Sequence, residues 1–551
     1  MRKAVVFTFI LLLLMQQASF ALKSGDFEYE VNNKNEVTIT KFIGNVANLE
    51  IPSDIDGNKV TKIGKSAFHG VSRLVTVTIP DSVTEISELA FALCSDLATV
   101  NIPNSVTTIG NSAFMYTGIT SITIPGSITV IEAQTFMGCH KLTSIDIPNS
   151  VTKISYLAFS GCTGLTSVNI PESVMSIDQG AFMNCRNLTD ITMSNSTQLE
   201  SSNIFGGCEK LKSINISADN PYYAFEDGIL FNKDKTELWV CLPSAKKGEF
   251  TVPDSIKTIK DSAFFGCVWL TSIIIPDTVT TIGNAAFGSC SELTEVDIPG
   301  SVTLIERMLF IDCKKLANIV IPKSVTAIGE GAFYGCAALT SIDIPSGVAF
   351  IGNGAFFGCS ALASIDIPSL VKEIGSIAFG GCGALASITL PDGIEVLSDN
   401  IFRGCVKLTA IDIPHNVTAI NSGAFWGCIS LTTITVPENV TSVGEQAFLE
   451  CRNLTEIVLP DGLLSIGDYA FYGCAKLSSI FIPSSVTTIG ENAFSGCDSL
   501  IELIISDGVE SIGAYAFENC VNLASVVIPR SVTTIGENAF LGCVNLIELS
   551  N

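Results

Sequence analysis

Charged residues are scarce in this chain. They make up 15% of its 551 residues, and 54 acidic residues against 30 basic ones give a formal net charge of −24. Proteins that bind nucleic acid or anionic membranes need clustered Lys or Arg, because their targets carry dense negative charge. The composition therefore argues against nucleic acid as a partner and favours basic or neutral ones.

Histidines are also few, and the usual motifs of enzymes are missing. The three histidines, His69, His140 and His415, lie far apart in the sequence. A catalytic triad would need one of them placed beside a nucleophile and an orienting acid. No G-x-S-x-G, phosphate-loop or dinucleotide motif occurs in a suitable strand-to-helix setting. The sequence predicts that the chain is not an enzyme and has no cofactor, catalytic residue or metal site.

Long hydrophobic runs are missing from the chain after its first residues. No later stretch approaches the ~18 apolar residues that span a bilayer. The N-terminus itself has Arg2 and Lys3, then an apolar run from Ala4 to Met15, then Ser19-Phe20-Ala21. This order is typical of a cleaved secretory signal; the alternative is an uncleaved anchor helix. We predict a signal peptide at residues 1–21, a secreted or cell-surface protein, and no membrane insertion after the signal is removed.

An internal repeat dominates the rest of the chain. Hydrophobic residues make up 47% of the composition, and prolines recur every 23 residues in two series, one from Pro103 to Pro171 and one from Pro253 onward. One spacing, between Pro103 and Pro125, is 22 residues. The repeated prolines are Pro103, Pro125, Pro148, Pro171, Pro253, Pro276, Pro299, Pro322, Pro345, Pro368, Pro391, Pro414, Pro437, Pro460, Pro483 and Pro529, with Ser506 in the place between the last two. A fixed period of this length is the signature of a solenoid, in which stacked units bury their apolar faces against one another.

Each place in the unit predicts a local structure. Leu339–Ile344 alternates apolar and polar residues, as a strand with one buried face does. Proline then ends the strand because it has no N–H to donate. Val-Thr-x-Ile predicts a second short strand. The Gly that follows it predicts a turn with positive φ. Ala-Phe predicts one short helical or 3-10 turn with Phe inside; Phe holds this place in 20 units, from Phe68 to Phe540. The predicted fold class is a β-rich, leucine-rich-repeat-like repeat solenoid of stacked parallel strands.

Two segments interrupt the period. Alternating strands around Asn32–Asn35 predict a capping β-hairpin at residues 22–51. Between Ser217 and Pro253 the spacing is 36 residues, and Gly228–Phe231 and Glu237–Leu242 predict a β-hairpin insert there. We therefore divide the chain into the signal peptide, the cap at residues 22–51, a first solenoid part at 52–217, a variant rung at 218–252 and a second solenoid part at 253–551.

The unit resembles the repeat of one known family. The stretch Pro483-Ser-Ser-Val-Thr-Thr-Ile-Gly-Glu-Asn-Ala-Phe-Ser-Gly-Cys497 is similar to the repeat of BspA-like (type 5) leucine-rich-repeat cell-surface proteins. The resemblance covers residues 22–551 and implies a solenoid fold. Members resemble extracellular adhesins of host-associated bacteria and mucosal protozoan parasites, several of which bind host matrix proteins. It implies little about the ligand, because a repeat encodes scaffold.

The cysteines follow the repeat. Eighteen of nineteen lie 14 residues after the proline place, from Cys94 to Cys543, and only Cys241 lies elsewhere. Thiols stacked on rungs about 4.8 Å apart rarely meet the geometry of a disulfide. We interpret them as a column of buried, reduced thiols; disulfides remain the alternative, and a metal column is disfavoured because no CxxC pair occurs.

The residue two before each proline should point outward, and two groups of these residues are candidate sites. Aspartates predict an acidic strip, interpreted either as a solvated surface or as a weak calcium site; they are Asp146, Asp297, Asp343, Asp366 and Asp412. At the C-terminal end the column turns apolar, and this group is interpreted either as a partner-binding patch or as tolerated exposed residues; its members are Val458, Phe481, Ile504 and Val527.

The sequence predicts a secreted or surface-displayed protein-binding solenoid, an adhesin that recognises host extracellular or cell-surface proteins. The alternative is a self-assembling structural component of a surface or matrix without a dedicated host ligand. That alternative draws on Leu546 and Leu549 at the last rung, since an uncovered strand edge invites self-association through the C-terminal edge.

Overall fold

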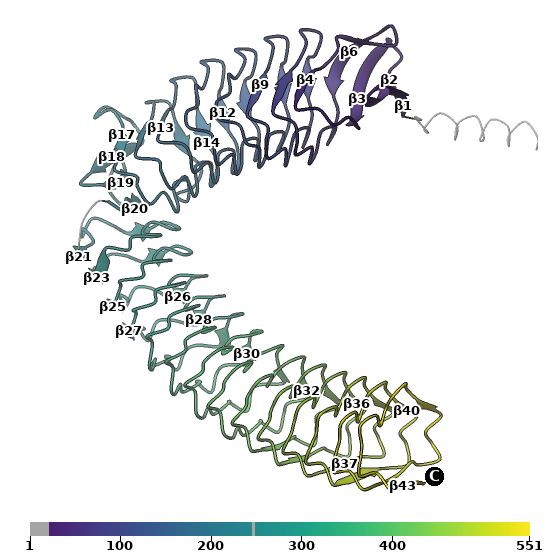
Figure 1. Cartoon of the computed structure of the whole chain (residues 1–551). Coiled ribbons are helices and arrows are strands. Elements are labelled where there is room, and N and C mark those ends of the chain that lie inside the picture. The colour runs from purple at the N-terminus through teal and green to yellow at the C-terminus, as the bar shows by residue number, and fades with distance from the viewer. Residues whose placement is uncertain (1–20, 245–247, 551) are drawn as a thin grey trace, which may run out of the picture. The chain divides into compact units, whose positions relative to one another are not determined.

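The structure, a computed structural model, describes residues 21–244 and 248–550. Residues 1–20 of the predicted signal peptide lie outside them. Two compact units make up the chain: residues 1–235 with Trp239–Ala245, and Thr236–Leu238 with Lys246–Asn551. In each unit the chain coils into stacked rungs, coloured purple to teal in the first and teal to yellow in the second (Figure 1). No helix long and apolar enough to cross a membrane occurs in the described part.

Most rungs contribute a first strand that ends before the proline place, and these strands stack in parallel where they pair. Other rungs form only isolated parallel bridges at this place, at Thr123, Asp146, Asp343, Asp366, Thr389 and Asp412. In the first unit the first strands are β4 (Asn48–Glu50), β7 (Thr76–Thr78), β9 (Thr99–Asn101), β13 (Ser167–Asn169), β15 (Asp190–Thr192) and β17 (Ser213–Asn215). In the second they are β21 (Gly248–Thr251), β23 (Leu270–Ile274), β25 (Glu295–Asp297), β27 (Asn318–Val320), β33 (Thr433–Thr435), β35 (Glu456–Val458), β37 (Ser479–Ile482), β39 (Glu502–Ile505), β41 (Ser525–Val527) and β43 (Glu548–Ser550).

A second, shorter strand follows the proline turn and forms its own parallel ladder, as the sequence predicts. In the first unit these strands are β6 (Asn58–Ile63), β8 (Glu85–Ile86), β10 (Thr108–Ile109), β11 (Val130–Ile131), β12 (Lys153–Ile154), β14 (Ser176–Ile177) and β16 (Gln198–Leu199). In the second they are β22 (Thr258–Ile259), β24 (Thr281–Ile282), β26 (Leu304–Ile305), β28 (Ala327–Ile328), β29 (Phe350–Ile351), β30 (Glu373–Ile374), β31 (Val396–Leu397), β32 (Ala419–Ile420), β34 (Ser442–Val443), β36 (Ser465–Ile466), β38 (Thr488–Ile489), β40 (Ser511–Ile512) and β42 (Thr534–Ile535).

Antiparallel strands occur at the two places where the repeat is interrupted. At the N-terminus β1 (Leu22–Ser24), β2 (Phe27–Val31) and β3 (Glu36–Phe42) form an antiparallel meander, and β3 continues in parallel with β6, to which the short β5 (Asp54–Ile55) also pairs. In the insert, β18 (Tyr223–Glu226) pairs antiparallel with β19 (Ile229–Asn232), ahead of β20 (Glu237–Cys241). In the same sheet β19 also lies beside β20, so the two segments expected to form the insert hairpin are neighbouring strands.

The prediction of a helical or 3-10 turn in each repeat is wrong. The described residues contain no helix, and the Ala-Phe segment is a run of turns. Its amides alternate between partners: Tyr334 donates to Gly331 within its rung at 3.0 Å, but Phe333 donates to Ala355 of the next rung at 2.8 Å. A helix would bond every amide within its own segment. Alternate amides of this segment donate to the next rung instead, so the segment does not form a helix.

The Gly after the second strand also has a different role from the predicted one. It was expected to supply a positive φ, but positive φ occurs elsewhere, as at Gly335 before the Cys (φ +73°). At Gly352 a Cβ atom would lie 2.5 Å from the amide nitrogen of Glu330 in the preceding rung. Gly is present because two backbones approach closely, and the lack of a side chain permits it.

The phenylalanine column fills the coil interior. Phe333, Phe356 and Phe379 are 0% exposed. Phe356 stacks on Phe333 with ring centroids 5.3 Å apart and on Phe379 at 5.6 Å, with the planes nearly parallel. Offset stacking of this kind adds to the burial energy of each ring. Each rung therefore completes the core of its neighbours, and the sequence prediction that Phe lies inside is confirmed.

Replacing one ring in the middle of the column tests this dependence. We expect Phe356→Ala to lower local stability by about 3–5 kcal/mol, because it leaves a cavity between two rings. Hydrogen exchange of amides in the adjoining rungs measures the loss. The control Phe350→Ala removes a ring that is 38% exposed, and it should cost about 1 kcal/mol or less. Equal losses in the two variants would contradict the stacked-core account.

Candidate functional site

Four apolar side chains face solvent on consecutive strands and are called the apolar stripe: Val458 on β35, Phe481 on β37, Ile504 on β39 and Val527 on β41. They are 56%, 49%, 45% and 62% exposed, respectively. The residues just before them in the strands, such as Ile457 and Ile480, are buried. Alternation along a strand thus separates a core face from an outer face, and it places the stripe outside as predicted.

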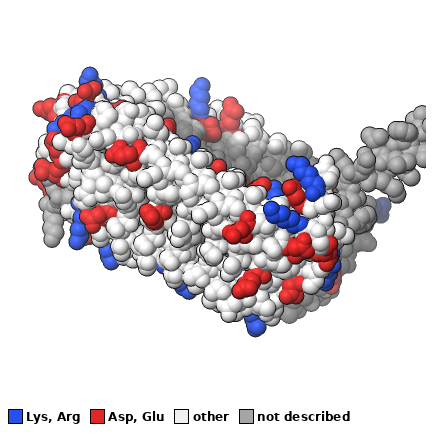
Figure 2. All heavy atoms as spheres, turned by 90° about the horizontal axis from the view of Figure 1, so that it is seen from above, with Lys and Arg blue, Asp and Glu red and all other residues white. Residues whose placement is uncertain are grey.

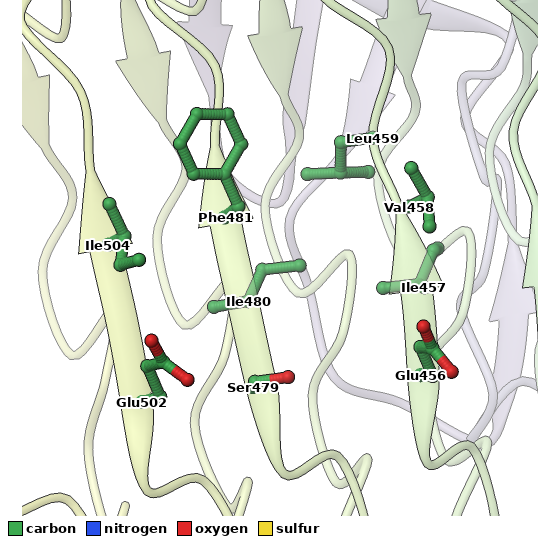
Figure 3. A pocket seen from close by; sticks show the side chains of 9 residues that line it. All are labelled: Glu456, Ile457, Val458, Leu459, Ser479, Ile480, Phe481, Glu502 and Ile504. Carbon is green, nitrogen blue, oxygen red and sulfur yellow. The ribbon is translucent and has the colours of Figure 1, made fainter.

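A shallow hollow of about 240 Å³ lies among three of these strands. Val458, Phe481 and Ile504 line it from β35, β37 and β39, with Phe481 between the other two (Figure 3). The strand ladder is interrupted here: β33 pairs with β35, and pairing resumes at β37 with β39. Between the rungs of β35 and β37, the amide nitrogen of Ser478 lies 3.4 Å from the carbonyl oxygen of Thr455. One rung earlier, the amide nitrogen of Thr455 lies only 2.9 Å from the carbonyl oxygen of Thr432. The hollow coincides with this loosened step between rungs.

Carboxylates flank the stripe at both ends of two strands. Glu456 begins β35 and Glu502 begins β39, and both line the hollow, as Figure 3 shows. Asp461 and Asp507 follow the opposite ends of the same strands. All four are exposed, and within the described residues none forms an ion pair. Sequence reasoning missed them, although the residue four before each proline place, followed along the repeat, identifies Glu456 and Glu502.

Two further apolar residues stand in the same outward column of the second unit. Ile274 on β23 is 52% exposed, and Val320 on β27 is 60% exposed. Asp297 on β25 separates them, and the strand register places Asp297 beside Val320. They therefore match the stripe residues in place and exposure but form no continuous apolar surface.

The five aspartates of the predicted acidic strip are all exposed, but the structure does not join them into one strip. Asp343 and Asp366 are neighbours on adjacent rungs, and Thr389 stands between Asp366 and Asp412. Asp146 belongs to the first unit, where it pairs with Thr123. Two adjacent carboxylates supply only part of the six to eight oxygens that calcium takes. In the described residues no group of three or more His, Cys, Asp or Glu could hold a metal ion.

Comparison with known families identifies the repeat. The sequence model of the BspA type leucine-rich repeat region matches the chain with six copies, over residues 42–133, 107–230, 244–363, 326–455 and 418–547. These ranges cover far more than half of the chain. It belongs to the BspA-type leucine-rich-repeat family.

Several solved structures are similar to this BspA-type chain. A leucine-rich cell-surface protein from Faecalibacterium prausnitzii is 29% identical, with 68% of this chain and 95% of that one covered and a TM-score of 0.47. A leucine-rich repeat protein from Bacteroides ovatus is 26% identical, with 68% and 96% covered and a TM-score of 0.38. A pneumococcal vaccine antigen is 19% identical, with 76% and 94% covered and a TM-score of 0.40. No curated protein matches significantly, and the family assignment rests on the repeat model alone.

The characteristic residues of this BspA-type repeat serve the scaffold. The hydroxyl of Ser324 donates to the carbonyl of Val302 in the preceding rung at 2.6 Å, and that of Thr326 donates to Thr303 at 3.3 Å. The pattern Ser-Val-Thr therefore joins rungs through side-chain bonds to the backbone. A repeat of this kind is typical of proteins without enzymatic activity.

The cysteine column also belongs to the scaffold. All the column thiols are buried except Cys543, which is half-buried, and no disulfide joins the cysteines of the described residues. Cys359 donates from Sγ to the carbonyl of Phe333 at 3.2 Å. Burial raises the pKa of the Cys359 thiol to about 12, and that of Cys405 to about 12 as well. Thiolate is the nucleophilic form of cysteine, so these side chains are poor nucleophiles.

The three histidines are exposed and far apart in this family member's sequence. Nδ1 of His140 lies 3.1 Å from the carbonyl oxygen of Gly161, and its ring centroid lies 6.3 Å from that of Tyr116. His69 and His415 occupy turns of other rungs. In the described part of the chain, none of them belongs to a group of three or more His, Cys, Asp or Glu that could hold a metal ion.

The thiol column makes a prediction that chemical labelling can check. At about pH 8 a thiol of pKa near 12 is almost wholly protonated, so we expect alkylation of the folded protein to reach Cys543 first and to leave Cys359 and Cys405 unmodified. In denaturant all nineteen cysteines should react without prior reduction. Mass spectrometry counts the labels in both states. Labels that appear only after reduction would show disulfides and overturn the interpretation.

Proposed function

We propose that this BspA-type chain is an extracellular protein-binding solenoid, an adhesin that recognises host extracellular or cell-surface proteins at the apolar stripe. The observation that carries the proposal is the row of four outward apolar side chains on consecutive strands, about half exposed, three of which line a hollow. Monomeric proteins rarely leave contiguous apolar patches uncovered unless they bind something. Aromatic residues in such patches contribute most to protein interfaces, and Phe481 lies at the centre of this one.

The charges of the chain support a protein partner over a nucleic acid. On the face shown in Figure 2, Lys and Arg are few and lie among Asp and Glu, with wide uncharged areas between them. The net charge of −24 would repel polyanions. The signal peptide predicted at residues 1–21 supports an extracellular location, where such partners occur. Binding without catalysis is consistent with a scaffold whose thiols are buried and whose histidines are scattered.

A binding array tests the proposal. The chain without residues 1–21 is applied to immobilised extracellular-matrix and cell-surface proteins at physiological salt. We expect at least one saturable interaction, and we expect the double variant Phe481→Asp, Ile504→Asp to weaken it about tenfold or more, since it places two charges on the stripe.

The matched control is the double variant Ile274→Asp, Val320→Asp. It adds the same charges at equivalent exposed places of the same column and should leave binding unchanged. Undiminished binding by the Phe481→Asp, Ile504→Asp protein would rule out the stripe as the site. An empty array together with concentration-dependent oligomers in light scattering would favour the structural alternative.

A further inference from the structure

The spacing and charges of the stripe point to a particular kind of partner. We infer that the stripe takes an amphipathic α-helix with cationic flanks, lying along the stack of rungs and across the strands. The inference rests on the proposed function, since it names the partner class for that same site.

The first argument is one of spacing. Strands in a sheet lie about 4.8 Å apart, so the four stripe residues on consecutive strands span about 14 Å from first to last. One turn of helix advances about 5.4 Å, and three turns about 16 Å. A helix with one apolar side chain per turn thus stays in step with the rungs along the stripe. An extended strand repeats its side chains about every 6.7 Å and would be out of step by more than one rung.

The second argument is one of charge. Glu456 and Asp461 bracket β35, and Glu502 and Asp507 bracket β39. Carboxylates therefore lie on both sides of the stripe, and the two on each side are two rungs apart, about 10 Å. Residues i and i+7 of a helix are separated by about 10.5 Å. Lys or Arg at this spacing on both flanks of an apolar face would meet all four carboxylates.

Basic residues near the stripe do not cancel this pattern. Lys476 precedes β37, and Arg530 follows β41. Neither forms an ion pair in the described part of the chain. The strands β37 and β41 begin with Ser479 and Ser525, so the acidic brackets belong to β35 and β39. The most acidic stretch of the stripe is therefore the one that contains the hollow.

The same charges disfavour a second copy of this chain as the occupant. Two copies packed face to face through the stripe would bring carboxylates against carboxylates around an apolar centre. Placing like charges opposite each other across an interface costs several kcal/mol of binding free energy. A cationic helix replaces that repulsion with complementary pairs.

A designed peptide provides the test. The probe is a fluorescently labelled Leu/Lys helix of about 14 residues, roughly four turns, with one leucine face and lysines on both flanks. Its scrambled counterpart has the same composition without an apolar face. Fluorescence anisotropy with the chain that lacks residues 1–21 should give at least about tenfold tighter binding for the amphipathic peptide. Binding should weaken as salt rises from about 50 mM to about 500 mM.

Variants separate the apolar and charge contributions. Glu456→Gln, Glu502→Gln should weaken binding and reduce its salt dependence. Phe481→Asp, Ile504→Asp should also weaken it, although this variant adds negative charge, and Ile274→Asp, Val320→Asp should not. Equal affinity for the scrambled peptide, or tighter binding by the Phe481→Asp, Ile504→Asp protein, would show that net charge alone attracts the probe and would overturn the inference.

The failure of this inference and that of the proposed function have different signatures. If an array protein binds at Phe481 but the amphipathic peptide does not compete with it, the helix inference is wrong and the binding role stands. If binding of every array protein is unaffected by Phe481→Asp, Ile504→Asp while the peptide still requires Phe481, the stripe recognises helices but is not the adhesive site.

Discussion

No rung of this solenoid is complete without its neighbours. The ring of Phe356 is buried only because Phe333 and Phe379 cover its two faces, and the amide of Phe356 donates to Ala378 of the next rung at 2.8 Å. The hydroxyl bonds of Ser324 and Thr326 reach back to the preceding rung in the same way. Stability in such a stack is a sum of contacts between nearest neighbours. The inward residues of every repeat are consequently fixed by stacking.

This constraint separates scaffold from function along the chain. The places for Phe, Cys, Leu and the close-approach Gly face the interior or the neighbouring backbone, so they have little freedom to serve a ligand. Outward places other than those of Ser324 and Thr326, whose hydroxyls bond the preceding rung, can vary from rung to rung. In one outward column, Asp343 and Asp366 are acidic, whereas Phe481 and Ile504 are apolar. A change of character along such a column is where a repeat protein can carry a specific surface.

Much of the fold could be predicted from the sequence, because residues at the same place in each repeat share the same position in the stack. A residue such as Phe356 recurs every 23 positions, which places it inside, and alternation along the strand places Phe481 outside. The turns were harder to predict. Ala-Phe suits a helix locally, and the bond from Phe333 to Ala355 exists only between rungs, so a single repeat does not reveal it. The role of Gly352 likewise depends on the backbone of Glu330 one rung away.

The candidate site was predictable in part. The apolar stripe follows from the sequence because its members share one place in the repeat. The hollow beside Phe481 does not, because the repeat runs on without a change of length where the ladder between β35 and β37 is interrupted. Glu456 and Glu502 could have been recognised by following a second column. The column indicates a functional site only once Glu456 and Glu502 are known to lie beside an exposed apolar surface.

The most direct measurement is oxidative footprinting of the chain without residues 1–21, alone and with a bound partner. Hydroxyl radicals modify exposed side chains, and the partner should protect those it covers. The account predicts that protection concentrates at Val458, Phe481, Ile504 and Val527, while Ile274 and Val320, which are equally exposed when free, remain reactive. Protection elsewhere, with Phe481 and Ile504 still oxidised at their free rates, would contradict the claim that the stripe is the binding surface.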